Sequence, residues 1–183
     1  MTEAEIEDKR ITLAEAAKKV HDGAGLFWGG FGYQRPPIAF AQELVRQKKR
    51  NLTIYTCGSE IDLEIMAGAG VASRFEIAFV AIEALGLAYN MRRRVEEGAV
   101  QIEDYSNLAM AMRFLGGALN VPFMPIRSLM GTDMERLSRY RGDKKLKVID
   151  DPFSGEKVCL VPSVQPDFSI IHAQRVDKSG NAQ

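Results

Sequence analysis

Short apolar runs alternate with segments in which apolar residues recur every three or four positions, and this alternation organises most of the chain. Runs of the first kind predict buried strands, and they lie at 25–28, 52–57, 75–82 and 100–103. The helical spacing predicts helices between them, near 13–20, 38–50, 61–67, 89–97 and 108–119. Strands and helices in such alternation favour an α/β fold, an open and mostly parallel sheet with flanking helices.

Local signals mark the ends of the first helix, and the C-terminal third is less regular. Thr12 and Glu15 have the spacing of a capping box, in which each side chain bonds to the backbone N–H of the other, and Asp22–Gly23 ends that helix. The segment 121–126 is apolar and extended, because proline restricts its neighbours. The remaining expectations are a polar, irregular stretch at 128–147 with one short helix at 135–139, and strand-like runs at 158–161 and 168–172.

The composition is that of one globular domain over residues 1–183, with 46% hydrophobic and 26% charged residues. There are 24 Lys and Arg residues against 24 Asp and Glu residues, so the net charge is zero. This balance argues against a dedicated nucleic-acid-binding protein, which needs a basic surface. No apolar run approaches the roughly 18 residues of a membrane helix, and the acidic N-terminus lacks the apolar core of a secretory signal. We therefore expect a cytoplasmic protein with no membrane or nucleic-acid partner.

The cysteines and histidines predict neither a disulfide framework nor a metal site. Cys57 and Cys159 lie far apart in apolar runs, which is typical of buried, reduced thiols. His21 stands near the end of the first helix, where it offsets the helix dipole. His172 follows an apolar run, and we interpret it as a core histidine.

The residues that follow the first predicted strand form the first candidate site. In open α/β sheets, ligands bind beyond the carboxyl ends of the strands. There the sequence Gly29-Gly30-Phe31-Gly32 allows a close approach to a ligand, and its N–H groups can face a phosphate or an oxyanion. Its spacing matches neither the dinucleotide-binding nor the phosphate-loop motif. A tight turn is the alternative, and Arg35 just beyond favours an anion-facing loop.

Carboxylates follow the next three strands. Glu60, Glu83 and Glu103 stand at these strand ends, and Ser106 comes shortly after Glu103. Together they predict an acid–base or nucleophilic site. The alternative is that each carboxylate balances the dipole of the helix that follows it.

Three stretches, in order, resemble the α-type subunit of class I coenzyme A transferases, the group that includes glutaconate CoA-transferase. The first combines the glycine loop with Arg35-Pro36-Pro37, and the second runs from the arginines at 92–94 to Glu103-Asp104-Tyr105-Ser106. The third comprises the segments 122–126, 131–133, 151–153 and 170–174. Each is weak alone, but the ordered set is specific and covers most of the chain.

The resemblance implies an open α/β fold and transfer of coenzyme A between carboxylic acids. A glutamate attacks an acyl-CoA to give an anhydride and then a glutamyl-CoA thioester, while the glycine loop donates hydrogen bonds to the oxyanion. The CoA thioester is a substrate, and no permanently bound cofactor is implied. In two-subunit members the nucleophile lies on a β-type subunit, and the Ser59-Glu60-Ile61 context differs from that of the nucleophile.

Two further expectations follow from the resemblance. The chain acts with a β-type subunit in a heterodimer or heterotetramer, with Glu60 and Glu103 as the candidate catalytic residues of this chain and acyl-CoA and a carboxylic acid as ligands. The family pattern also continues past the residue that matches Gln183, so the C-terminal part of the domain is missing.

Two alternatives stay open. The related ring-cleaving hydrolases of steroid degradation share the fold and hydrolyse a cyclic diketone CoA ester, in which case Glu103 is the activating base. The other alternative is a non-catalytic, truncated fragment that binds coenzyme A. Candidate residues for substrate binding in every case are those of the loop and strand ends, namely Gly29, Gly30, Phe31, Gly32, Arg35, Glu83 and Ser106.

Overall fold

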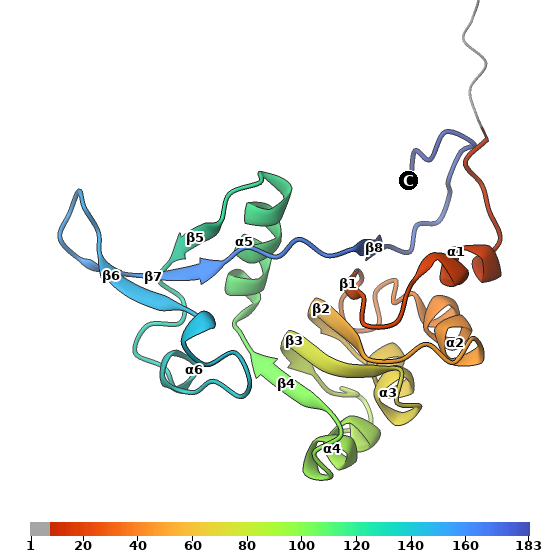
Figure 1. Ribbon diagram of the computed structural model, residues 1–183, viewed down its shortest axis with the longest axis horizontal. Helices are drawn as coiled ribbons and strands as arrows, with labels where there is room; N and C mark the ends of the chain where they lie inside the picture. The colour runs from red at the N-terminus through yellow and green to blue at the C-terminus, as the bar shows by residue number, and fades with distance from the viewer. Residues whose placement is uncertain (1–7) are drawn as a thin grey trace, which may run out of the picture.

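A computed structural model describes residues 8–183, and its centre is a parallel sheet of five strands (Figure 1). The strands are β1 (Gly25–Trp28), β2 (Leu52–Ser59), β3 (Ala72–Val80), β4 (Gln101–Asp104) and β8 (Phe168–Ile170). They lie in the order β4-β3-β2-β1-β8, and every neighbouring pair is parallel. The predicted fold class is confirmed, and the carboxyl ends of all five strands meet at one edge.

Helices cover the two faces of this sheet unequally. One face carries α1 (Leu13–Lys19), α2 (Ile38–Arg46), α3 (Ile61–Gly68) and α4 (Tyr89–Glu96), and the other carries α5 (Asn107–Ala118) (Figure 1). The first face buries the larger core, in which Leu26, Ile54 and Phe75 are fully buried. The capping box predicted for α1 is present, because Thr12 Oγ1 accepts from the N–H of Glu15 and Glu15 Oε2 accepts from the N–H of Thr12.

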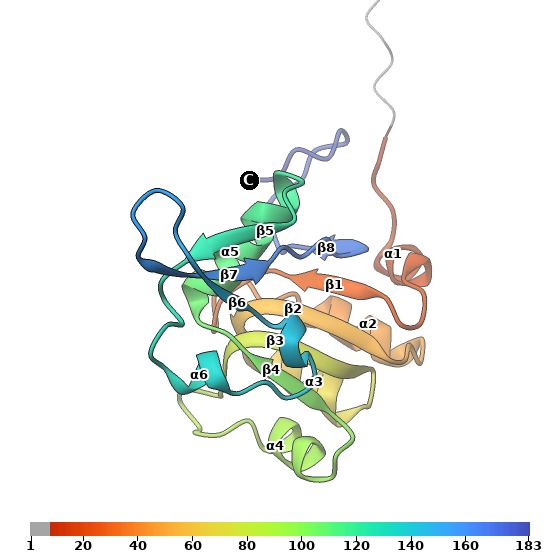
Figure 2. The same ribbon diagram turned by 60° about the vertical axis from the view of Figure 1, so that its left-hand side comes forward.

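The C-terminal third differs from the expectation, because all of its strands except β8 build a second, antiparallel sheet beside the first (Figures 1 and 2). This sheet has the order β5-β7-β6, with β5 (Phe123–Ile126), β6 (Lys147–Asp150) and β7 (Lys157–Pro162). The strand β6 was not predicted, and the short helix α6 spans Asp133–Arg136 instead of 135–139. Every residue of β6 is exposed, so its sequence lacks the buried positions from which a strand is recognised.

Helix α5 lies between the two sheets and contacts both. Gly116 and Gly117 of this helix let the chain between β7 and β8 pack directly against it. A Cβ atom on Gly117 would lie 1.9 Å from the carbonyl oxygen of Val164. The close approach therefore requires glycine at this position.

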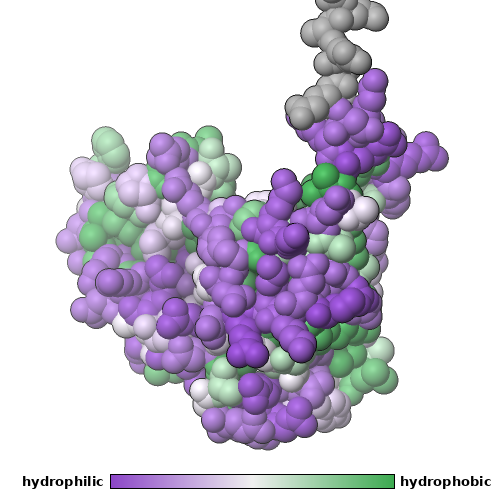
Figure 3. All heavy atoms as spheres, turned by 45° about the vertical axis from the view of Figure 1, so that its right-hand side comes forward, coloured by the Kyte–Doolittle hydropathy of each residue, from purple (hydrophilic) through white to green (hydrophobic). Residues whose placement is uncertain are grey.

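Hydrophilic side chains cover most of the face drawn in Figure 3, and hydrophobic ones are visible at its lower right and in its left-hand part. Within residues 8–183, no helix combines the length and the apolar character needed to cross a membrane.

Candidate active site at the carboxyl ends of the parallel strands

The glycine loop, which is Gly29–Gly32, leaves the end of β1 in a conformation that only glycine adopts readily. Gly30 has a φ of +93° and Gly32 a φ of +54°. Phe31 and Gln34 close the turn by exchanging backbone hydrogen bonds of 3.0 and 2.8 Å. Within residues 8–183, the N–H groups of Gly30 and Gly32 have no hydrogen-bond acceptor. The loop therefore offers two free donors, and its role in binding a ligand stays a prediction.

A cavity of about 540 Å³ opens beside this loop. Gly30, Arg35 and His172 line it, and the side chains of Arg35 and His172 are exposed. Arg35 forms no ion pair with residues 8–183. The interpretation of His172 as a core histidine is wrong, because β8 ends at Ile170 and the imidazole is exposed, with its Nδ1 atom 3.3 Å from the carbonyl oxygen of Pro36.

Glu60 follows β2 and lies against the same loop. The residue is 1% exposed, and neither of its carboxylate oxygens has a hydrogen-bond partner in the described part of the chain. Its Oε1 atom lies 3.5 Å from the point that a Cβ atom on Gly32 would occupy. A buried carboxylate without partners is costly to the fold, so this one calls for an explanation beyond packing.

Glu83 stands after β3 in an exposed loop, and a contact ties that loop to the glycine loop. The hydroxyl of Tyr33 accepts a hydrogen bond of 3.0 Å from the N–H of Ala84. Phe31 is 48% exposed, and its ring edge lies 3.5 Å from the Cβ position of Gly58 at the end of β2. The ends of β1, β2 and β3 therefore form one continuous surface.

Ser106 and Glu103, in contrast, accept hydrogen bonds from backbone N–H groups near β4 and so stabilise the local structure there. The Oγ atom of Ser106 accepts from the N–H of Ala109 as the N-cap of α5 and lies 2.8 Å from the Oγ atom of Ser128. Glu103 is a residue of β4 itself, fully buried, and pairs in register with Glu76 of β3. Since β4 is three strand spacings of roughly 4.8 Å from β1, neither residue meets the glycine loop.

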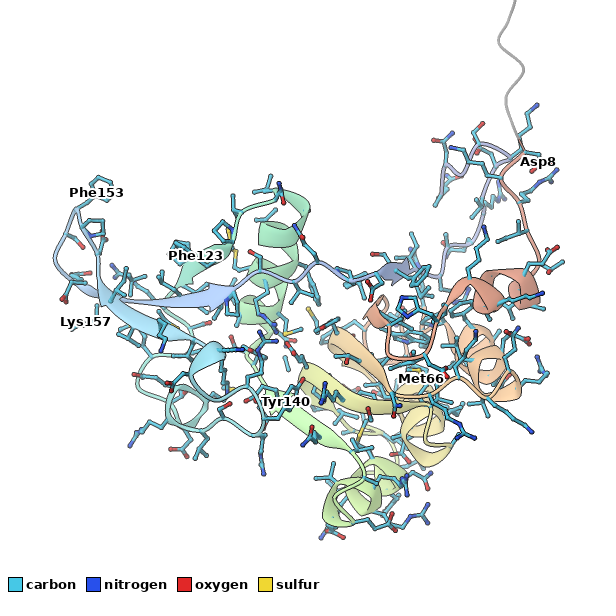
Figure 4. The ribbon with its side chains drawn as sticks, viewed as in Figure 1. Asp8, Met66, Phe123, Tyr140, Phe153 and Lys157 are labelled. Atoms are coloured by element: carbon cyan, nitrogen blue, oxygen red, sulfur yellow. The ribbon has the colours of Figure 1, made fainter. Side chains whose placement is uncertain are left out.

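The carboxylate of Glu103 anchors the turn at 138–141. It accepts hydrogen bonds from the N–H groups of Arg139, Tyr140 and Arg141, and Lys145 lies 3.2 Å away. Tyr140 in turn reaches across to Glu76, placing the turn between the two sheets (Figure 4). Burial opposes the charge on Glu103, but the N–H donors outweigh it and lower the pKa of this carboxyl. The catalytic role predicted for Glu103 stays a prediction, and its contacts give it a structural role.

We expect Glu103→Gln to destabilise the chain by about 1–3 kcal/mol at neutral pH, because the amide meets N–H donors with a donor of its own. A carboxyl whose pKa is lowered on folding stabilises the fold above its unfolded pKa, and the gain is lost as pH falls through the folded value. Urea unfolding at pH 7 and below pH 4 should therefore show a smaller pH dependence in the variant. The matched control is Glu96→Gln, which changes a largely exposed carboxylate. Equal pH dependence in wild type and Glu103→Gln would contradict this assignment.

No set of three or more His, Cys, Asp and Glu side chains among residues 8–183 is arranged to hold a metal ion. Cys57 is half-buried and Cys159 is buried, and both are free thiols. The free groups at this edge thus include the loop donors, the Glu60 carboxylate and the Arg35 cation. Such a set suits a ligand with a carbonyl and an anionic group.

Comparison with known proteins agrees with this arrangement. The sequence model of the coenzyme A transferase family matches residues 10–183. The chain is 33% identical over 188 residues to the α-type subunit of glutaconate CoA-transferase from Acidaminococcus fermentans, with 96% of this chain and 59% of that one covered. It is 31% identical over 175 residues to the α-type subunit of 3-oxoadipate CoA-transferase from Pseudomonas knackmussii, with 93% and 60% covered. The chain thus spans about 60% of the length of these relatives.

Solved structures give the same result. The crystal structure of glutaconate coenzyme A-transferase from Acidaminococcus fermentans superposes with a TM-score of 0.84 at 33% identity, covering 94% of this chain and 58% of that one. A variant of the decarboxylase AibA/AibB superposes with a TM-score of 0.82 at 27% identity, covering 94% and 65%. With the family match over nearly the whole sequence, these likenesses show that the chain belongs to the coenzyme A transferase family, among its α-type subunits.

Proposed function

We propose that this chain is the α-type subunit of an enzyme that transfers coenzyme A between carboxylic acids through an acyl-CoA intermediate. A β-type subunit completes the enzyme as a heterodimer or heterotetramer and supplies the nucleophilic glutamate. Membership of the family supports this assignment, and so do the two relatives that are themselves α-type chains of CoA-transferases. The enzyme takes an acyl-CoA and a carboxylic acid as substrates and binds no permanent cofactor, and we place it in the cytoplasm.

The observation that carries the proposal is the pair of free N–H groups at Gly30 and Gly32, beside the buried carboxylate of Glu60. When a carboxylate attacks a thioester, negative charge develops on the carbonyl oxygen, and fixed N–H donors stabilise that charge. Arg35 borders the same cavity and can attract the carboxylate of the acid substrate. Gly29, Phe31 and Glu83 complete the proposed binding surface at the strand ends.

Hydrolysis of a CoA thioester with Glu103 as the base has less support. A general base needs a free oxygen within reach of the water it activates. The carboxylate of Glu103 accepts from three backbone N–H groups and from the Ser138 hydroxyl, and it lies beside Lys145. Ser106 likewise caps a helix. We therefore favour transfer over hydrolysis.

The test is to co-express the chain with a β-type subunit of the same family from its source organism and to assay CoA exchange between acetyl-CoA and a panel of mono- and dicarboxylic acids. We expect exchange with at least one acid and no net release of free CoA. A stable complex that exchanges no acid would refute transfer, and release of CoA in water would support hydrolysis. If CoA raises the thermal stability of the full chain but the complex with the β-type subunit is inactive, the result supports the alternative of a non-catalytic chain that binds coenzyme A.

A further inference from the structure

Building on the proposed function, we propose that Glu60 is a catalytic residue that accepts the thiol proton of coenzyme A. Asp62 is the positioning residue that holds Glu60 against the glycine loop. In the proposed step, the S–H bond of CoA breaks and its proton moves to a carboxylate oxygen of Glu60. The sulfur electron pair forms a bond to the acyl carbon of a mixed carboxylic anhydride, and the other carboxylate leaves. In the reverse direction, Glu60 returns the proton to the departing thiolate.

The environment of Glu60 supports a role in chemistry more than one in packing. The residue is 1% exposed, yet both carboxylate oxygens are without a hydrogen-bond partner within residues 8–183. Other buried carboxylates of this chain are satisfied, such as that of Glu64, which accepts from the N–H groups of Asn90 and Met91. Unmet buried polar groups persist where the function needs them.

Free donors and a free acceptor meet at the glycine loop. The N–H groups of Gly30 and Gly32 have no acceptor among the described residues, and Glu60 Oε1 lies 3.5 Å from the Cβ position of Gly32. The ligand that would satisfy both carries a carbonyl oxygen and a hydrogen donor next to it. A coenzyme A thiol approaching an acyl carbonyl group has this combination.

Asp62 joins the ends of β1 and β2 through its two oxygens. Oδ1 accepts from the Ser59 hydroxyl at 2.6 Å, from the Glu60 N–H at 3.2 Å and from the Leu63 N–H at 3.1 Å. Oδ2 accepts from the indole N–H of Trp28, the last residue before the glycine loop. Asp62 is fully buried, so the loop and the turn that carries Glu60 are fixed relative to each other.

The experiment compares variants of this chain in the complex with the β-type subunit, with CoA exchange measured from pH 6 to pH 9. Glu60→Gln should lower kcat by about 100-fold at pH 7 with KM nearly unchanged, and the deficit should shrink toward pH 9 as the thiol ionises by itself. Glu60→Asp, which keeps the carboxylate, should retain more activity than Glu60→Gln. The matched control is Glu64→Gln, which changes a buried glutamate four residues further along the chain, inside α3, and which should exchange CoA like the wild type.

Asp62→Asn tests the positioning role, because asparagine keeps only one oxygen for the bonds that Asp62 accepts. We expect a loss in kcat of about tenfold and a change in the fluorescence of the full chain, whose one tryptophan is Trp28. A Glu60→Gln complex with wild-type kcat, or with a deficit independent of pH, would overturn the proton-acceptor role. Unchanged fluorescence in Asp62→Asn would overturn the positioning role. A wild-type complex without any exchange refutes the proposed function instead, and the fluorescence result still decides the role of Asp62.

Discussion

Gly30→Ala should lower the rate of CoA exchange by about 100-fold or more, which is the usual effect of losing an oxyanion donor. The backbone of Gly30 has a φ of +93°, and an added Cβ atom would lie 2.8 Å from the carbonyl oxygen of Arg35. Because that oxygen belongs to the backbone, the loop must move, and its free N–H groups move with it. Exchange is measured in the complex with the β-type subunit, after confirming that the variant assembles.

The matched control is Gly23→Ala. Gly23 has a φ of +81°, close to that of Gly30, but nothing lies within 4 Å of its added Cβ atom. Both variants should lose about 1–2 kcal/mol of stability from the left-handed backbone, and only Gly30→Ala should lose activity. An assembled Gly30→Ala complex that exchanges CoA at the wild-type rate would exclude the glycine loop from the reaction.

The parallel sheet could be predicted from the sequence, and so could the edge at which we place the candidate site, because both depend on local patterns. Short apolar runs between amphipathic helices define parallel strands, and parallel strands bring their carboxyl ends together. The glycine loop and Glu60 were therefore expected at one edge. The contact that fixes the loop against the turn carrying Glu60 could not be predicted. The hydrogen bond from Trp28 to Asp62 joins residues 34 positions apart, and no spacing rule connects them.

The second sheet could not be predicted for a related reason. Whether the strand at 158–161 joins the parallel sheet or starts another depends on its partners, and one of these, β6, shows no buried face. The burial of Arg113 in α5 could not be predicted either, because it also depends on a partner that is distant in sequence. An arginine in an amphipathic helix normally faces water, but Arg113 is fully buried because Glu76 of the parallel sheet supplies its counter-charge.

That buried pair leads to the largest stability effect we expect, a loss of about 3–5 kcal/mol in Arg113→Met. The guanidinium pairs with Glu76, donates to the Pro162 carbonyl at 3.0 Å and lies 4.1 Å from the centre of the Tyr105 ring. In the variant, the Glu76 carboxylate keeps its ion pair with Arg141 at 2.7 Å but loses its ion pair with the buried guanidinium. Urea unfolding of the full chain measures the loss.

Arg127→Met is the matched control, since Arg127 pairs with Glu156 on the surface, where both side chains are more than 60% exposed. A pair of this kind contributes about 0–1 kcal/mol.

The double variant Glu76→Gln/Arg113→Met should be more stable than the sum of the single losses predicts, because removing both charges leaves neither of them buried without its partner. If Arg113→Met costs no more than Arg127→Met, the pair between α5 and β3 does not hold the two sheets together. If the costs differ as expected, the antiparallel sheet is attached to the parallel sheet through a buried charge that no local sequence pattern reveals.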